Sequence, residues 1–412
     1  MSYCLKQCAK LLRNLQILSP RRYLSQEVLR NASVLGIETS CDDTGCAVVD
    51  MTGKILGESL HSQNAVHVRY GGVNPLIANE LHRRNIEQAV AEALENSNLT
   101  VDDIDAIAVT TRPGMLMSLQ VGVKYAKYLA RKHNKPLIPI HHMEAHALVV
   151  RVSQDVPFPY LSLLISGGHC LLAVVKDVDE FYLLGKSLDN APGEVLDKGA
   201  RRMKLKNIPT YSQMAGGRAI ELAAKHCKDP DLFRFPLPLA KYRDCNFSFS
   251  GLKDALDRNL MKKELEHGVM GDGIIPEVNE LCAAYQLAVA EHIAHRTERA
   301  VIFCEKNTLL GEYRNLVVSG GVACNDFIYK SLQVVTKKLG YEVYRPPPRL
   351  CTDNGVMIAW NGIEKLRKPC GIVADIPISS IEPVAPLGNS LINEVKQSNL
   401  PVRVTRLRKM CL

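Results

Sequence analysis

YLSLLISGGHCLLAVV, residues 160–175, reads as two apolar strands joined by a turn built on Ser-Gly-Gly. The same apolar-apolar-Ser-Gly-Gly core recurs in LVVSGGVACNDFI, residues 316–328. There it predicts a strand, a glycine turn and then a helix. This internal repeat favours two related α/β lobes that face a cleft, each with a glycine turn at a strand end.

A third turn of this kind lies near the start of the chain. VLGIETSCDDTGCAVVD, residues 34–50, predicts a hairpin whose turn is crowded with hydroxyls and acids. Paired glycines let the backbone approach a ligand closely and point its N–H groups at phosphate oxygens. A single Ser-Gly-Gly is usually only a turn. Three such turns at strand ends together favour a nucleotide-like ligand.

The composition is that of a globular protein with more than one lobe. The chain has 412 residues, of which 46% are apolar and 23% charged. No apolar run approaches the roughly 20 residues that a membrane-spanning helix needs, so we expect a soluble protein without membrane insertion. Thirteen cysteines are scattered without a C-x-x-C pair, which favours a reducing compartment over a disulfide framework.

Positive charge is concentrated in the first 30 residues. These residues contribute +5 to the formal net charge of +8. They also contain leucines at helical spacing and a single acid, Glu27. This basic, acid-poor composition is typical of a mitochondrial transit peptide. An ordinary basic arm that binds nucleic acid is the alternative. We favour targeting, because the strand-like VLGIE follows at once.

The rest of the pattern predicts further helices and strands. We expect helices over 76–95 and 277–305 and a strand over 103–110. Arg112-Pro113-Gly114 breaks the chain before a further helix that runs to about 132. The proline-rich YRPPPRL, residues 344–350, leads into a last helix, which we expect to carry Asp353 in its first turn.

Two groups of basic residues lie on predicted helices. One is the stripe Lys124, Lys127, Tyr128, Arg131 and Lys135, and the other is the run Lys198, Arg201, Arg202, Lys204 and Lys206. Each is most simply a solvated helix face. Contact with a phosphate backbone becomes plausible only if the partner is an anionic polymer.

HHMEAH, residues 141–146, places His142 and His146 four residues apart on a predicted helix. Side chains at that spacing project from one side of a helix, so both nitrogens can reach one metal ion. A pair of this kind is more often a packing or solvent feature. The spacing alone therefore leaves the question open.

Seven motifs in this order resemble the family of tRNA N6-adenosine threonylcarbamoyltransferases, formerly labelled O-sialoglycoprotein endopeptidases. They are GIETSCDDTG, HHMEAH, LISGGH, PGEVLDK, FSFSGLK, SGGVACN and CTDNGVMIA, and they span about residues 34–365. With the basic N-terminal segment, the mitochondrial branch of the family is the closest match. The resemblance implies the α/β fold of actin, Hsp70 chaperones and sugar kinases, with a nucleotide cleft between duplicated lobes.

The resemblance also implies a division of the chain. We expect a transit peptide over 1–30, a first α/β lobe over 31–140 and a second α/β lobe with the metal and nucleotide turns over 141–352. Residues 353–412 are expected to form a C-terminal helix that returns towards the first lobe, followed by a basic tail.

The family's functional residues map onto this sequence through the motifs. The resemblance implies metal ligation by His142, His146 and Asp353, for which zinc and iron are both suitable ions. It implies substrate binding by Leu164, Ile165, Ser166, Gly167, Gly168, His169, Asp197, Gly217, Glu221, Cys324 and Asn325. The motif around Gly217 is stretched here to YSQMAGGRA, so Gly216 is the alternative at that position.

The implied reaction moves an L-threonylcarbamoyl group from its adenylate to the exocyclic amine of the adenosine next to the anticodon. Its substrates are mitochondrial tRNAs that read codons beginning with adenine, and a separate synthase supplies the adenylate. Asp42 is our candidate for orienting or deprotonating the amine, and a turn residue that caps its own backbone is the equal alternative. For RNA contact we place the run Arg201, Arg202, Lys204 and Lys206 first.

Three further expectations concern partners and rival functions. We expect a location in the mitochondrial matrix and consider a homodimer possible. A metal-dependent glycoprotease and a small-molecule kinase of the same fold are the rival functions. In a His-Glu-x-x-His protease helix the glutamate follows the first histidine directly, whereas Glu144 lies about 200° round the helix from His142.

Overall fold

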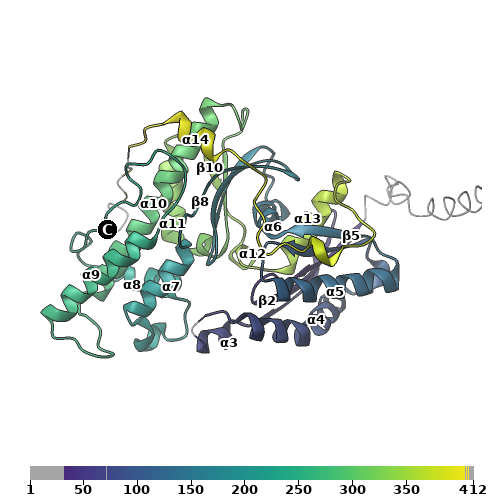
Figure 1. Ribbon diagram of the computed structural model, residues 1–412, viewed down its shortest axis with the longest axis horizontal. Helices are drawn as coiled ribbons and strands as arrows, with labels where there is room; N and C mark the ends of the chain where they lie inside the picture. The colour runs from purple at the N-terminus through teal and green to yellow at the C-terminus, as the bar shows by residue number, and fades with distance from the viewer. Residues whose placement is uncertain (1–31, 71, 404, 406, 408–412) are drawn as a thin grey trace, which may run out of the picture. The chain divides into compact units, whose positions relative to one another are not determined.

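The computed structural model describes residues 32–70, 72–403, 405 and 407 (Figure 1). The predicted transit peptide, residues 1–30, lies outside the described residues. The chain forms two compact units. Unit 1 contains the residues up to His142 together with Asn354–Val384, and unit 2 contains Met143–Asp353 and the residues from Ala385 onward. Residues of the segment 353–412 thus belong to both units.

Unit 1 is built on a five-stranded mixed sheet in the order β3-β2-β1-β4-β5. The central strand β1 pairs antiparallel with β2 and parallel with β4, and β4 pairs parallel with β5. The strands are β1 (Ser33–Glu38), β2 (Asp43–Asp50), β3 (Ile55–Ser62), β4 (Ala106–Arg112) and β5 (Leu137–His141). β1 is buried along its whole length, as a central strand covered on both faces should be.

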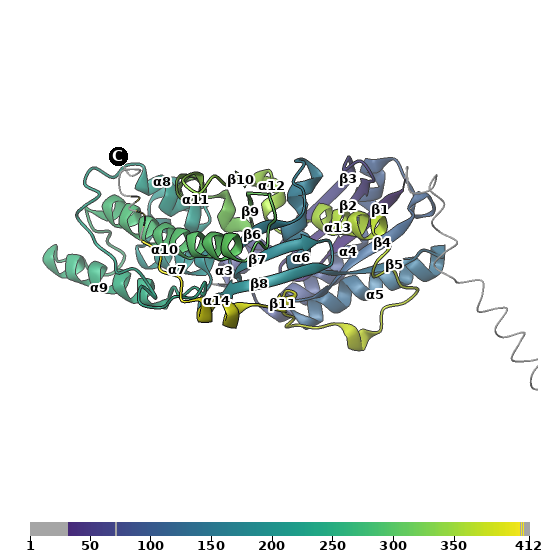
Figure 2. The ribbon, with the colours of Figure 1, turned by 90° about the horizontal axis from the view of Figure 1, so that it is seen from above.

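Helices cover both faces of this sheet (Figures 1 and 2). Leu35 and Ile37 belong to one hydrophobic core together with residues of α4 (Pro75–Ser97) and α5 (Leu116–His133). The opposite face of β1 carries Gly36 and packs against α13 (Gly355–Arg367). The remaining short elements of unit 1 are α3 (Asn64–Arg69) and the 3₁₀ turns η3 (Val101–Asp103) and η8 (Ile378–Ser380).

Glycines set the close approach of α13 to the sheet. A Cβ added at Gly36 would lie 2.2 Å from the backbone nitrogen of Ala359, and one at Gly45 would lie 2.7 Å from the nitrogen of Gly355. No side chain fits in that space. The glycines of GIETSCDDTG are therefore required by helix packing, and this packing fixes the strand ends that carry the motif's polar residues.

Unit 2 contains a six-stranded mixed sheet in the order β10-β9-β6-β7-β8-β11. Its strands are β6 (Tyr160–Ile165), β7 (Cys170–Asp177), β8 (Glu180–Lys186), β9 (Asn315–Ser319), β10 (Glu342–Tyr344) and β11 (Asn389–Ser390). The strand β6 pairs antiparallel with β7 and parallel with β9, and β9 pairs parallel with β10. Apart from β11, the order and directions repeat those of unit 1, which confirms the predicted duplication and the two-lobed α/β class.

The longest helix of unit 2 is α10 (Val278–Lys306), which is buried along most of its length and contacts α8, α9, α11 and α14. The other helices are α6 (His142–Leu148, whose first residue belongs to unit 1), α7 (Pro192–Arg202), α8 (Gly216–Ala224), α9 (Ser250–Glu266), α11 (Asp326–Lys337), α12 (Pro348–Cys351) and α14 (Ile392–Ser398). The 3₁₀ turns are η4 (Val149–Val152), η5 (Leu205–Asn207), η6 (Pro209–Tyr211) and η7 (Gly321–Cys324). None of the described helices is long and apolar enough to cross a membrane.

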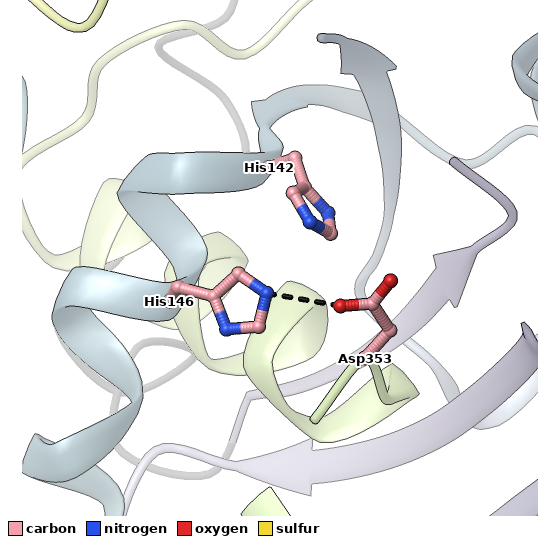
Figure 3. Close-up of side chains that lie close together, drawn as sticks. All are labelled: His142, His146 and Asp353. Carbon is pink, nitrogen blue, oxygen red and sulfur yellow. Dashed lines mark hydrogen bonds and ion pairs between the residues drawn. The ribbon is translucent and has the colours of Figure 1, made fainter. Parts of the chain in front are cut away.

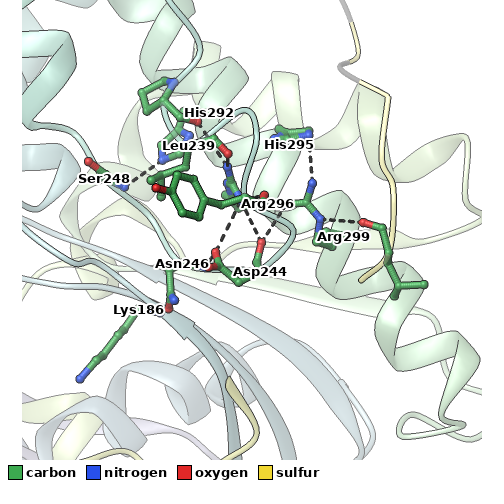
Figure 4. A network of polar contacts seen from close by, with 12 residues as sticks. Lys186, Leu239, Asp244, Asn246, Ser248, His292, His295, Arg296 and Arg299 are labelled. Carbon is green, nitrogen blue, oxygen red and sulfur yellow. Dashed lines mark hydrogen bonds and ion pairs between the residues drawn. The ribbon is translucent and has the colours of Figure 1, made fainter. Parts of the chain in front are cut away.

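Two arginines of α10, Arg296 and Arg299, are fully buried and form hydrogen bonds to backbone carbonyls of the loop that begins at residue 238 (Figure 4). The Arg296 guanidinium donates hydrogen bonds to the carbonyls of Tyr242 and Asp244, both at 2.9 Å. Arg299 donates to the Asp244 carbonyl at 2.8 Å and to that of Leu400 at 3.2 Å. Backbone carbonyls thus satisfy most donors of these buried cations.

The predicted elements agree with the structure in kind, with two differences at their ends. The strand expected from residue 103 begins at Ala106, because Val101–Asp103 forms a 3₁₀ turn. The placement of Asp353 in the first turn of the last helix is wrong. Asn354 is the N-cap, since its side chain accepts a hydrogen bond from the Met357 amide, so Asp353 lies in the loop before the helix.

Candidate metal centre and substrate turns

The helix α6 begins directly at the end of β5 and carries both histidines of HHMEAH. His142 and His146 are buried, and they lie one helical turn apart. Both histidines lie in a helix, so Glu144, two residues after His142, projects about 200° round the helix axis from it. The helix therefore supplies two imidazoles on one side without the adjacent glutamate of a His-Glu-x-x-His protease.

His142 is oriented by polar groups of β1. Its Nδ1 lies 3.2 Å from the Oε2 of Glu38 and 3.1 Å from the Oγ of Ser40. Glu38 is fully buried and also accepts hydrogen bonds from the Thr110 hydroxyl, at 2.6 Å, and from the Ser40 amide. An Nδ1–H that donates to this carboxylate leaves Nε2 as the unprotonated nitrogen. That is the tautomer a metal-ligating histidine needs.

His146 meets the third predicted ligand. Its Nε2 lies 3.0 Å from the Oδ1 of Asp353, and His142 points toward the same space (Figure 3). One ligand atom of each of the three side chains lies within 4.8 Å of the others. Among the described residues, this is the group of histidine, cysteine and acidic side chains that could hold a metal ion.

The donor set fits a divalent ion. Two ligands of one zinc ion at bond lengths near 2.0–2.2 Å stand roughly 3 Å apart, which His146 and Asp353 already satisfy. Two imidazoles and one carboxylate suit zinc and iron and leave coordination positions open for a substrate. The three side chains predicted as ligands are therefore brought together with suitable chemistry.

Asp42 lies on the turn between β1 and β2, and this turn is held in place by a buried histidine. His82 of α4 has no exposed surface, and its Nε2 lies 2.9 Å from the Cys41 carbonyl while its Nδ1 lies 2.8 Å from the Thr44 hydroxyl. A carbonyl only accepts, so Nε2 carries the proton and Nδ1 accepts from Thr44. Burial lowers the pKa of His82, which favours this neutral form.

The Asp42 carboxylate itself is half-buried, and no hydrogen bond to it is found among the described residues. The Ser40 carbonyl beside it accepts from the Met115 amide at 2.8 Å, which anchors the turn from a second side. The self-capping alternative for Asp42 is not observed. Asp42 belongs to unit 1, whereas the predicted substrate-binding residues from Leu164 onward belong to unit 2.

The first glycine turn joins β6 to β7 and contains the predicted residues Leu164, Ile165, Ser166, Gly167, Gly168 and His169. The Ser166 hydroxyl accepts hydrogen bonds from the amides of Gly168 and His169, at 3.3 and 3.0 Å. A Cβ added at Gly167 or Gly168 would meet no atom within 4 Å. The surrounding protein does not require glycine there, and the open backbone leaves room for a ligand to approach.

Asp197 and the 216–217 glycines lie together, as the motif assignment requires. The Gly217 amide donates to the Asp197 carboxylate at 3.1 Å. A Cβ on Gly216 would lie 2.7 Å from Asp197, so Gly216 is the glycine that packing demands. Gly217 would meet only Leu196, at 3.7 Å, and remains the more open of the two positions.

The second glycine turn is linked to α8 through Glu221. This buried carboxylate accepts from the Asp326 amide at 2.8 Å and from the Arg218 guanidinium at 2.6 Å. Asn325 caps α11, since its side chain accepts from the Ile328 amide at 3.0 Å while its Nδ2 donates to Gln286. Glu221 and Asn325 therefore have structural partners in addition to any ligand.

The basic run begins on α7 and continues into η5, and several of its members are paired with acids. The Arg202 guanidinium holds the pKa of Glu264 at about 2, and it forms hydrogen bonds to that carboxylate at 2.9 and 3.0 Å. Lys204 also lies 3.1 Å from Glu264. In the other stripe, Lys127 and Arg131 pair with Asp375. The positive charges of Arg201 and Lys206, the other two residues of the run predicted to contact RNA, act on the Asp197 carboxylate and oppose the rise in its pKa that burial causes.

Sequence reasoning did not assign a role to Glu38, Ser40 or His82. The available signal was the position of Glu38 at the end of an apolar strand, where it is buried and needs partners. Their actual partners are up to 104 residues away in the chain, so only the folded structure reveals the contacts.

Comparison with known proteins gives a consistent result. The family model described as TsaD, tRNA N6-adenosine threonylcarbamoyltransferase, matches residues 54–360. A mitochondrial tRNA N6-adenosine threonylcarbamoyltransferase of Danio rerio is 49% identical over 376 residues, which is 91% of this chain and 93% of that protein. The mitochondrial protein of that name from Homo sapiens is 49% identical over 90% of this chain and 89% of its own length. A bacterial relative from Rhodospirillum rubrum is 43% identical over 81% of this chain and 90% of its own.

Among solved structures, that of HypF from T. kodakarensis covers 82% of this chain and 48% of its own, with a TM-score of 0.47 and 16% sequence identity.

Proposed function

Because the chain belongs to the family of tRNA N6-adenosine threonylcarbamoyltransferases, we propose that it takes the L-threonylcarbamoyl group from an adenylate. The acceptor is the N6 amine of the adenosine next to the anticodon, in mitochondrial tRNAs that read codons beginning with adenine. The observation that carries the proposal is the convergence of His142, His146 and Asp353.

The reaction is an acyl transfer from a mixed anhydride. The N6 amine attacks the carbamoyl carbonyl carbon, the bond from that carbon to the phosphate oxygen breaks, and AMP leaves. One proton departs from the amine. The chain must therefore bind the adenylate, orient the amine, accept or direct this proton and keep water from the carbonyl.

We assign His142, His146 and Asp353 as ligands of one divalent ion, zinc or iron. Such an ion, when bound, acts as a Lewis acid that polarises a substrate oxygen. Glu38 and Ser40 support this role by holding the His142 ring in one orientation and tautomer. The buried position of both imidazoles lowers the entropy that is lost when ligands are ordered.

Asp42 is the proposed group that orients the amine or accepts its proton. The support is local: its carboxylate has no protein hydrogen bond that we find among the described residues, while the backbone on both sides is anchored by His82 and Met115. A carboxylate fixed in position but available for a ligand is suited to that task.

The adenylate is proposed to bind at the glycine turns of unit 2. The backbone at Gly167 and Gly168 is open enough for a phosphate group to approach it closely. Asp197, Gly217 and Glu221 are assigned to its ribose and base. Cys324 and Asn325 belong to the second glycine turn of the same binding site. Tests of this assignment should measure adenylate binding apart from transfer.

A direct experiment incubates the protein with threonine, bicarbonate, ATP, a threonylcarbamoyl-adenylate synthase and unmodified tRNA, and then analyses the nucleosides by mass spectrometry. We expect threonylcarbamoyladenosine only when all components are present. Phosphorylation of a small molecule at the expense of ATP, without tRNA, would favour the kinase alternative. Cleavage of a glycoprotein would favour the protease.

The relatives from Danio rerio and Homo sapiens are named as mitochondrial proteins, and we propose that this chain acts in the mitochondrial matrix. Residues 1–35 fused to a fluorescent reporter should direct it to mitochondria, because their composition is that of a transit peptide. A fusion that begins at residue 36 of the chain is the control. Diffuse cytosolic fluorescence from the first fusion contradicts the prediction.

A second copy of the chain is the proposed protein partner. Large apolar side chains are exposed on α4 and α5, namely Leu76, Leu116, Met117 and Tyr128. Exposed apolar surface of this kind is typical of a surface that another protein covers. Light scattering on the purified protein tests this, and a monomeric mass over a wide concentration range would contradict it.

A further inference from the structure

Two cysteines of unit 2 come together although 26 residues separate them in the chain. Cys324 ends η7, in the second glycine turn, and Cys351 ends α12. The Cys324 thiol lies 3.6 Å from the Pro348 carbonyl, and the Cys351 thiol lies 3.4 Å from the Pro346 carbonyl. Both sulfurs thus lie at the same short proline-rich segment, residues 346–348, where η7 and α12 meet.

The two thiols have different environments. Cys351 is fully buried, whereas Cys324 is partly exposed and accessible to small reagents. The pKa of the Cys324 thiol lies below its ordinary value, because the Cys351 side chain hydrogen-bonds its sulfur and because the Arg345 guanidinium lies nearby. Arg345 is fixed there by hydrogen bonds to the Ala323 carbonyl and the Asp326 carboxylate, at 2.9 and 3.0 Å.

A helix end adds to this environment. α11 begins at Asp326, two residues after Cys324, and its N-terminal amides favour negative charge close by. A partly exposed sulfur beside a fixed guanidinium and a helix N-terminus is the setting of a reactive cysteine. The buried second thiol next to it is suited to resolve an oxidised first one.

We propose that Cys324 and Cys351 form a peroxide-sensitive dithiol, which closes to a disulfide between η7 and α12. The Cys324 thiolate attacks one oxygen of hydrogen peroxide, the O–O bond breaks, and sulfenic acid and hydroxide result. The Cys351 sulfur then attacks the sulfenic sulfur. The S–O bond breaks, and the hydroxyl leaves with the Cys351 proton as water. A dithiol such as dithiothreitol reverses the reaction and is itself oxidised to a disulfide.

The disulfide would act on two functional segments at once. Thr352 and Asp353 follow Cys351 directly, and a Cβ on Gly321 of η7 would lie 3.8 Å from the Thr352 side chain. A covalent bond here pins the loop that carries Asp353 against the glycine turn that carries Asn325. Where the proposed function holds, a displacement of about 1 Å at such a site lowers transfer by up to about a hundredfold.

The test begins with the unmodified full chain and needs no activity measurement. Tryptic peptides 315–330 and 350–365 each contain one of the two cysteines. After brief treatment with hydrogen peroxide and alkylation of the remaining thiols, we expect these peptides as one disulfide-linked species, lighter than their sum by two hydrogens. Dithiothreitol should separate them. Folded protein in which both peptides stay unlinked, or in which Cys324 proceeds to sulfinic acid without a bond, overturns the proposal.

Matched variants identify the partners. Cys351→Ser should retain transfer activity in the reduced state and accumulate a sulfenic acid on Cys324 that a dimedone probe labels. Cys227 is a control of similar exposure whose pKa is raised by burial, and Cys227→Ser should leave the peroxide response unchanged. If Cys351→Ser does not fold, the peptide map of the unmodified chain is sufficient to show whether the disulfide forms.

Transfer activity is measured on the same samples, so that the proposed function and the proposed disulfide can be tested separately. Both the proposed function and the effect of the disulfide are supported if the reduced protein transfers threonylcarbamoyl and if its rate falls about tenfold or more when the disulfide forms. Reduced protein without transfer, in which the disulfide still forms, contradicts the proposed function alone. An oxidised protein that carries the bond and keeps its full rate contradicts the effect on the site.

Discussion

Glu38 is a fully buried carboxylate that contacts His142 of the candidate metal centre as well as Thr110. We predict that Glu38→Gln lowers metal affinity by about 10–100-fold, because the amide orients the His142 ring less well and can present a donor to Nδ1. Competition with a chromogenic chelator measures this. The exposed Glu87 on α4 provides the control, and Glu87→Gln should bind metal normally.

An unchanged affinity in Glu38→Gln would show that His142 is oriented by other means. His146→Ala and Asp353→Ala extend the test, since each removes one of three ligand side chains and should abolish most metal binding and transfer. Metal content equal to that of the unmodified protein in both variants would contradict the assignment of the centre.

His292 gives a pH-dependent prediction. Its Nε2 accepts a hydrogen bond from the Ser248 amide at 3.0 Å, and burial lowers its pKa to about 3 (Figure 4). In the unfolded chain its pKa returns to about 6.5. The unfolded state therefore binds more protons between these values, so the free energy of unfolding falls as the pH drops from about 6.5 towards 3.

The variant His292→Gln should weaken this pH dependence, because glutamine retains an acceptor for the Ser248 amide and does not titrate. Urea unfolding at pH 7 and pH 5 measures the effect. His226→Gln is the control for an exposed histidine and should leave the dependence unchanged. The prediction is wrong if both variants show the slope of the unmodified protein.

The helix α13 packs closely on the sheet of unit 1 because the strands carry glycines, such as Gly36, where the helix touches them. Gly36→Ala would bring a methyl group to 2.2 Å from the Ala359 nitrogen, so α13 must shift. We expect a loss of about 1–3 kcal/mol in the free energy of unfolding. Gly251→Ala on α9 is the matched control, because a Cβ there meets no atom within 4 Å and alanine favours a helix.

Prediction from sequence worked best for elements with a strong local pattern. The helices α4, α5 and α10 lie within two residues of their predicted bounds, because apolar periodicity and cap signals are local properties of the chain. The helix start near Asp353 was misplaced, since aspartate and asparagine are both good N-caps and only the hydrogen bond to Met357 identifies Asn354.

The ligand triad followed from the family resemblance, and the structure brings its members together. The residues that hold the triad were not predictable. Glu38 contacts His142 across 104 positions, and His82 contacts Cys41 across 41, so no local pattern records either pair. Contacts of this kind depend on strand order and on which helix faces which edge.

RNA binding concerns the charge of the molecule as a whole. Arg202 and Lys204 are engaged with Glu264, and Arg201 and Lys206 complete the predicted run. We predict that the double substitution Arg201→Ala, Lys206→Ala weakens tRNA binding, because it removes two positive charges from this surface. The logarithm of the tRNA-binding constant falls linearly with the logarithm of the salt concentration. The substitution should reduce the steepness of this line by about one for each phosphate contact that is lost. Filter binding at two salt concentrations measures both quantities. Adenylate binding should stay unchanged.

The control is Arg202→Ala with Lys204→Ala, which should lower stability, because it leaves Glu264 without its partners, while the salt slope changes little. If the first pair leaves both affinity and slope unaltered, the RNA surface lies elsewhere. The stripe with Lys124 and the segment around Arg403 are then the next candidates.

Both units depend on residues that the ribosome makes late. Unit 1 needs α13 and the segment up to Val384, and unit 2 needs β11, Leu400 and the buried Leu407. Neither core is complete until these residues have been made, so we expect the final packing of both units to follow synthesis of the first 350 or so residues. A chain that stays open until it is nearly complete can still be threaded through a translocation pore. Premature stop codons near its end should yield a polypeptide that proteolytic quality control removes.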